Sequence, residues 1–101
     1  MEFLVGSCQR SDRGFTVLGR CCLGPIQIGD HFRAVERTTF EKQGSQFTSE
    51  QQEHLGEVDL RVESIENYGK SFTLLQEGWT CSMTLSGTDN GLLGENVTLI
   101  G

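Results

Sequence analysis

The stretch Arg13–Glu36 places the tightest limit on the fold of this 101-residue chain. Two turn signals, Gly24-Pro25 and Gly29-Asp30, follow each other so closely that only a short extended piece fits between them. The residues before the first turn and after the second alternate between apolar and polar side chains, a pattern typical of half-buried strands. The stretch therefore predicts three short extended segments folded against one another.

The remaining sequence has the same character. It holds 13 Gly, a single Pro and 36% hydrophobic residues, which suits many short strands joined by tight turns. The length corresponds to one domain with a core of its own. We therefore expect residues 1–101 to form a single all-β domain.

The clearest alternation runs from Trp79 to Leu85, where every second side chain is apolar. A similar pattern begins at Val58. We expect about seven strands. That number is enough to close a small antiparallel barrel of six to seven strands and to remove its exposed edges. Their ranges are 2–10, 15–22, 31–36, 58–66, 71–76, 79–85 and 96–100.

The first hairpin has a predictable register. If its turn is centred on Asp12-Arg13, Cys8 lies opposite Val17 and Cys21 lies opposite Leu4. This pairing puts Leu4, Cys8, Val17 and Cys21 on one face, which we expect to be the barrel interior. It brings no two cysteines together, so reduced thiols are expected.

A polar insertion at about residues 37–55 interrupts the strand pattern and exceeds the usual connection length. Its large apolar residues are Phe40, Phe47 and Leu55. Thr48 or Ser49 followed by Gln51 or Gln52 is similar to a capping box, and Gly56 could end a helix of about two turns. A twisted hairpin or a disordered loop is the alternative, and the sequence leaves the three open.

The same stretch resembles a known family. Its residues match the pattern R-G-T-V-V-T-G-R-V followed by G-x-I-x-x-G-D, the hallmark of the second domain of elongation factor Tu-type translational GTPases. The matching residues are Arg13, Gly14, Val17, Gly19, Arg20, Gly24, Ile26, Gly29 and Asp30. Residues 62–67 (VESIEN) are similar to that domain's V-x-S-I-E-M strand, and residues 78–87 fall where the family has G-x-N-V-G-x-x-L-x-G. The resemblance implies a β-barrel, with Gly19 and Gly29 serving close strand approach and turns.

That family's barrel holds the aminoacylated 3′ end of transfer RNA with a Glu, an Asn and a nearby Arg. Glu66 matches the Glu, but Thr80 replaces the Asn and Gly69 stands about where the Arg would be. A carboxylate alone cannot supply the donors of such a site. We therefore do not expect this activity, and Glu66 is interpreted as a strand-end carboxylate.

The net charge of -6 and the scattering of eight basic residues disfavour nucleic acid as the main partner. The sequence contains no phosphate-binding G-x-x-x-x-G-K-S/T string and no short Cys or His spacing typical of a metal site. We expect neither an enzyme nor a bound cofactor or metal.

The hypothesis for function is a non-catalytic, stand-alone translation-factor-like barrel that acts as a protein-interaction module. The alternative is an RNA- or ribosome-associated accessory barrel. The expected binding residues are Phe40 and Phe47 in the insertion, the aromatics Tyr68 and Trp79, and Glu66. The amino-terminal residues carry no apolar run typical of a signal peptide, so a cytoplasmic location without membrane contact is expected.

Overall fold

The structure is a computed structural model, which describes the backbone of residues 1–43 and 46–101 and the side chains of residues 1–38 and 52–101. All regular elements in these backbone ranges are strands. They are β1 (Glu2–Ser11), β2 (Gly14–Leu23), β3 (Ile26–Gln27), β4 (His31–Gln43), β5 (Gln46–Asn67), β6 (Lys70–Phe72), β7 (Leu74–Leu75), β8 (Thr80–Thr88) and β9 (Thr98–Ile100). The expected strand at 71–76 is split, because β6 pairs with β5 whereas β7 pairs with β3.

Six strands close into an antiparallel barrel. The sheet runs in the order β4-β9-β1-β2-β8-β5, and β5 pairs with β4 again to close it. β6 pairs with the last residues of β5, Ile65 to Asn67. The predicted all-β fold and small closed barrel are confirmed.

The core follows from alternation along the strands. In β5 the side chains of Val58, Leu60 and Val62 are buried, and a register shift between Val62 and Ser64 returns Ile65 to the interior. In β8 the inward residues are Cys81, Met83 and Leu85, as the alternation predicts, whereas Trp79, the first residue of that alternation, precedes the strand and is exposed. Both strands therefore expose their polar residues on the outer face of the barrel.

The first hairpin keeps the expected register only near its turn. Cys8 lies opposite Val17 as predicted, but a β-bulge at Gly6 shifts the pairing, so Cys21 lies opposite Phe3 rather than Leu4. The extra residue reverses the alternation beyond the bulge. The expected interior position of Leu4 is wrong: its side chain is 42% exposed, and Phe3 is buried in its place.

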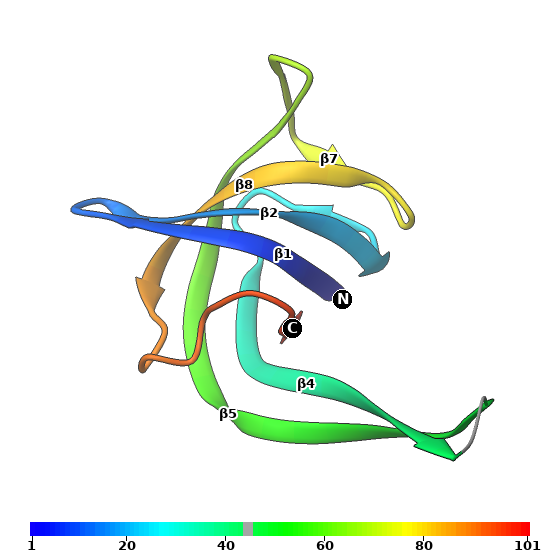
Figure 1. Cartoon of the computed structure of the whole chain (residues 1–101). Coiled ribbons are helices and arrows are strands. Elements are labelled where there is room, and N and C mark those ends of the chain that lie inside the picture. Colours follow the sequence, from blue (N-terminus) through cyan, green and yellow to red (C-terminus); the bar gives the residue numbers. More distant parts are fainter. Residues whose placement is uncertain (44–45) are drawn as a thin grey trace.

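The polar insertion forms a hairpin arm, residues 37–57, in which β4 and β5 run on together beyond the barrel (Figure 1). β9 pairs with β4 only at residues 34–36, and β8 pairs with β5 only from Asp59 onward. The two-turn helix considered for this stretch is wrong, and the twisted hairpin is the correct alternative. So short a helix is marginal in isolation. Pairing with β4 instead satisfies the backbone N–H and C=O groups of β5, because it continues the hydrogen bonds that join the two strands within the barrel.

The turn at Gly29-Asp30 has the role that its sequence predicts. The carboxylate Oδ2 of Asp30 accepts a hydrogen bond from the Gln27 backbone N–H at 2.8 Å, and Gly29 has a φ of 93°. Gly29 N–H also bonds to the Val62 carbonyl at 2.8 Å, which ties this turn to β5. Within the described ranges, no helix is long and apolar enough to cross a membrane.

Candidate binding site

Outward side chains of four neighbouring barrel strands line up in two rows. The first row crosses from Glu66 on β5 through Ser82 and Leu18 to Ser7 on β1. The second row runs from Thr80 through Arg20 to Leu4. The rows lie two residues apart along β8 and β2, roughly 7 Å, and three residues apart along β1, because Gly6 is bulged.

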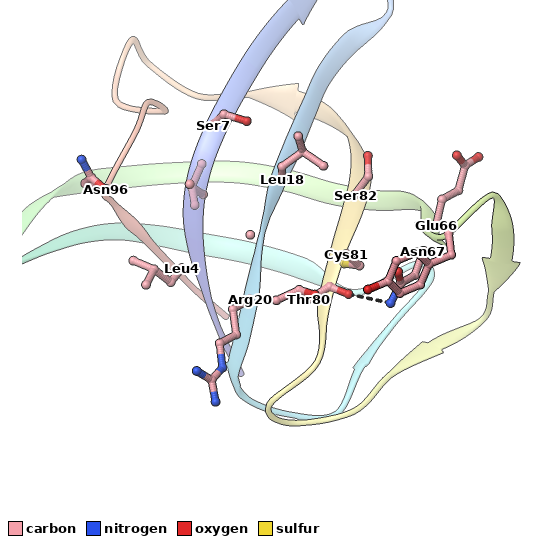
Figure 2. A pocket seen from close by; sticks show the side chains of 14 residues that line it. Leu4, Ser7, Leu18, Arg20, Glu66, Asn67, Thr80, Cys81, Ser82 and Asn96 are labelled. Atoms are coloured by element: carbon pink, nitrogen blue, oxygen red, sulfur yellow. Dashed lines mark hydrogen bonds between the residues drawn. The ribbon is translucent and has the colours of Figure 1, made fainter.

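A groove lies between these rows. Its floor includes Val5, Gly19 and Cys81, which lie opposite one another in the sheet, and the side chains of Val5 and Cys81 point into the barrel. The cavity has a volume of about 770 Å³. Figure 2 shows Leu4 and Leu18 on neighbouring strands, with Glu66 towards one end and Asn96 towards the other. We call this feature the binding groove.

The binding groove has a sharply defined end at the β5–β6 turn. Asn67 donates its side-chain N–H to the Thr80 carbonyl at 2.9 Å, which fixes this turn to β8 (Figure 2). Tyr68 follows with a φ of 51°, and its ring is 95% exposed. A large amphipathic side chain that contacts so little of its own protein is available to a partner.

Apolar surface in the binding groove is unusual for an outer face. Leu4 is 42% and Leu18 is 53% exposed. The groove's two charged side chains, Arg20 and Glu66, are exposed and take part in none of the ion pairs that the described residues form. The groove therefore combines an apolar centre with one cationic and one anionic group.

A smaller hollow lies on the other side of the Asn67–Thr80 contact. It is lined by Phe72, Gly78 and Trp79 together with Asn67 and Thr80. Trp79 is 45% exposed and packs edge-on against Phe72, with ring centroids 6.3 Å apart. Trp79 thus lies beside the binding groove rather than in it.

A third hollow, the arm-base pocket, lies where the hairpin arm leaves the barrel. Its volume is about 500 Å³. It shares Leu4 and Asn96 with the binding groove. Its other lining residues are Glu2, Cys22, Glu36, Thr38, Gln52, Thr98 and Ile100.

The structure brings together only some of the residues expected to bind a partner. Glu66 and Tyr68 both line the binding groove, and Trp79 lines the hollow beside it. The side chains of Phe40 and Phe47 lie outside the described residues. The arm that carries them begins at the opposite end of β5 from Tyr68 (Figure 1).

Sequence reasoning missed Leu4, Leu18 and Arg20 as wall residues of one groove. The signal for Leu4 was Gly6, because an isolated glycine in a strand often marks a bulge that reverses the alternation. The alignment of Leu18 with Ser82 and of Arg20 with Thr80 depends on the β2–β8 register. That pairing is not local in sequence, so the pattern of either strand alone does not contain it.

The cysteines are poor candidates for chemistry. All four are free, and burial raises the pKa of the Cys81 thiol to about 12. Desolvation also raises the pKa of Cys21, with a smaller contribution from the neighbouring Cys22 thiol. Because the thiolate is the nucleophile and the metal ligand, these buried thiols are unreactive in the folded protein. The described residues contain no group of three or more His, Cys, Asp or Glu side chains placed to hold a metal ion.

The fold and the groove together define a small antiparallel β-barrel with an open groove on its outer face. Comparison with protein-family models, with curated proteins and with solved structures gives no match to this chain.

Proposed function

We propose that this barrel is a non-catalytic protein-interaction module, similar to the second domain of elongation factor Tu-type translational GTPases, and that it binds its partner in the binding groove. One observation carries the proposal: Leu4 and Leu18 are both about half exposed in a groove that ends at a fully accessible Tyr68. Apolar groups concentrated in a hollow with a polar surround are typical of interaction sites. Cys81, which lies in the floor of this groove, has its pKa raised to about 12 by burial and is not an activated nucleophile.

The hallmark positions support the relation to that barrel. A Cβ on Gly19 would collide with the Leu4 carbonyl oxygen, so the glycine permits close approach of β1 and β2. Gly29 has the positive φ that a tight turn requires, and Asp30 bonds across that turn. These residues act mechanically, as the resemblance implies.

The arrangement of basic residues favours a protein partner over RNA. Arg10 pairs with Asp89 at 2.8 Å and Arg33 with Asp59 at 3.1 Å. Arg13 in the β1–β2 turn and Arg20 on β2 are seven residues apart in extended chain, roughly 23 Å. A phosphate backbone is bound by clustered, uncompensated cations, whereas these charges are dispersed and partly neutralised. An RNA- or ribosome-associated role is therefore the alternative, and capture with and without nuclease, described below, distinguishes it from binding to a protein.

The hairpin arm is a second proposed contact surface. Beyond residue 36 in β4 and before residue 59 in β5, these strands pair only with each other among the described pairings. Phe40 and Phe47 lie on this arm, and aromatic residues are enriched at protein interfaces. We also place the protein in the cytoplasm, where its four free thiols stay reduced.

The test is affinity capture from a cell extract with and without nuclease, comparing the native chain with a Leu4→Glu/Leu18→Glu variant. Ile28→Glu is the matched control, because Ile28 is 43% exposed but outside the three hollows. We expect nuclease-resistant capture that the double variant loses and the control keeps. Capture abolished by nuclease and by Arg20→Ala would instead establish the RNA alternative.

The arm is tested separately by replacing residues 39–51 with a tight turn. Thr38 and Gln52 lie opposite each other, so the shortened hairpin keeps the arm-base pocket and every pairing of the barrel. Unchanged melting with weakened capture supports a role for Phe40 and Phe47. Unchanged melting with unchanged capture rules the arm out as a contact surface.

A further inference from the structure

We propose that the arm-base pocket receives a Lys or Arg side chain from the same partner segment whose apolar residue lies in the binding groove. This inference rests on the proposed function and specifies the partner. The partner segment carries a basic residue close to an apolar one. The geometry and the charge of the two hollows carry the argument.

The charge of the arm-base pocket is one-sided. Two carboxylates line it, Glu2 on β1 and Glu36 on β4, and none of the described residues that line it is basic. The binding groove, by contrast, has one residue of each sign, Arg20 and Glu66. A cationic side chain is therefore favoured in the pocket and gains no net charge attraction in the groove.

The two carboxylates face the pocket from opposite sides of β9. On the outer face, Glu2 lies opposite Ile100 and Glu36 lies opposite Thr98. Two strand spacings and a two-residue offset along β9 separate their backbones by roughly 12 Å. Two flexible glutamate side chains can converge on a single guanidinium or ammonium group across such a span. Hydrogen bonds between a carboxylate and such a cation are stronger than hydrogen bonds between neutral groups.

The rest of the lining fits the stem of a basic side chain. Leu4 and Ile100 supply apolar surface, and Thr38, Gln52 and Thr98 supply polar groups. Lys and Arg bury their methylene chains against apolar surface while the charged head keeps polar contacts. A purely apolar ligand would leave both carboxylates without a counter-charge.

One short segment can reach both hollows. Leu4 and Asn96 line the binding groove and the arm-base pocket alike, so the two hollows meet at these residues. The groove spans three strand spacings, from β5 to β1, or roughly 14 Å. At about 3.5 Å per residue, an extended segment of about four residues fills it, and the next residue along lies at the pocket.

The test is selection from a library of random displayed peptides on the folded, full-length protein. Three versions are compared: the native chain, Glu2→Gln/Glu36→Gln, and the control Glu57→Gln/Glu95→Gln, which removes the same charge from exposed positions outside the hollows. The native chain and the control should select peptides with Lys or Arg near a Leu, Met or aromatic residue. The Glu2/Glu36 variant should keep the apolar preference and lose the basic one.

Affinities of the selected peptides provide the quantitative check. At 0.1 M salt the Glu2/Glu36 variant should bind about tenfold more weakly than the control, equivalent to about 1.4 kcal/mol. Selected peptides that lack basic residues, or equal affinities for the variant and the control, would overturn this inference and leave the proposed function standing. If the native chain selects no peptides and its capture is nuclease-sensitive, the proposed function itself fails.

Discussion

Nη2 of Arg10 lies 2.8 Å from Oδ2 of Asp89, joining the end of β1 to the loop that follows β8. Asp89 is only 7% exposed, and its Oδ1 accepts a hydrogen bond from the Gly91 N–H at 3.2 Å. Oδ2 accepts no hydrogen bond of good geometry from the described residues, so the ion pair alone compensates its burial. The guanidinium also lies over the Phe15 ring, with its Cζ 5.3 Å from the ring centroid.

Replacing Asp89 by Ala should therefore destabilise the barrel by about 2 kcal/mol. The change removes both the ion pair and the hydrogen bond that holds the loop at Gly91. Urea unfolding measures the loss. Glu95→Ala, at an exposed position of the same loop, is the control and should change stability by less than about 0.5 kcal/mol. Equal effects of the two substitutions would contradict an anchoring role for Asp89.

Gly19→Val should destabilise the barrel by about 3 kcal/mol. A Cβ at this position meets the Leu4 carbonyl oxygen and lies 2.9 Å from the Phe3 ring, so β1 and β2 would have to separate. Gly94→Ala is the comparison, since nothing lies within 4 Å of a Cβ there. Thermal melting of both variants is the measurement. A Gly19→Val melting temperature equal to that of the native chain would mean that the hallmark match is accidental.

Gly29→Val should destabilise for a different reason. Nothing lies within 4 Å of a Cβ at Gly29, but its φ of 93° is strained for a β-branched residue, at a cost of about 1 to 3 kcal/mol. Gly29→Asn should recover part of that loss in the same melting assay, because Asn tolerates positive φ better. No difference between Val and Asn would show that backbone strain is not the cause.

The sequence alone predicts the structural features that depend on residues close together in the chain. Alternation located the inward faces of β5 and β8, and the turn residues located the first hairpin and the Gly29-Asp30 turn. The helix considered for the polar stretch was wrong, because a local capping pattern carries less weight than pairing with a long partner strand. The outward position of Leu4 could have been inferred only by treating Gly6 as a bulge. The groove itself also depends on the registers that join the β1–β2 hairpin to β8 and β8 to β5, and no local pattern encodes these long-range pairings.

Asp59 should make the barrel sensitive to acid. A hydrogen bond from His31, 2.9 Å away, holds the pKa of the Asp59 carboxyl below its ordinary value, and Arg33 at 3.1 Å lowers it further. Because the folded pKa is depressed, the stabilisation is complete above the ordinary Asp pKa of about 3.9 and is lost as the pH falls through the lower folded value.

Denaturant unfolding between pH 2 and pH 6 tests this dependence. The native chain should be more stable than Asp59→Asn at pH 6, and the difference should shrink as the pH falls below about 4. Asp12→Asn is the control, because Asp12 takes part in none of the ion pairs that the described residues form. A constant difference across the range would exclude the His31–Asp59 contact as its source.

The four thiols should react in the order of their exposure. Cys22 is exposed and Cys8 is half-buried, whereas Cys21 and Cys81 are buried. A thiol-specific reagent at pH 8 should therefore label Cys22 first and Cys8 more slowly, and should reach Cys21 and Cys81 only when the barrel unfolds. Site-resolved mass spectrometry follows the order, and labelling of Cys81 at the rate of Cys22 would contradict the burial.

The same burial makes stability fall with rising pH. In the unfolded chain Cys81 ionises near the ordinary Cys pKa of about 8.5, whereas in the folded barrel its pKa is raised to about 12. Between these values the unfolded state loses a proton that the folded state keeps, so stability should decline by up to about 1.4 kcal/mol per pH unit. Cys81→Val keeps an apolar side chain in the core without an ionisable group, so its unfolding free energy should fall less steeply between pH 9 and 10.5. Parallel curves for the native chain and Cys81→Val would assign the alkaline sensitivity to other residues.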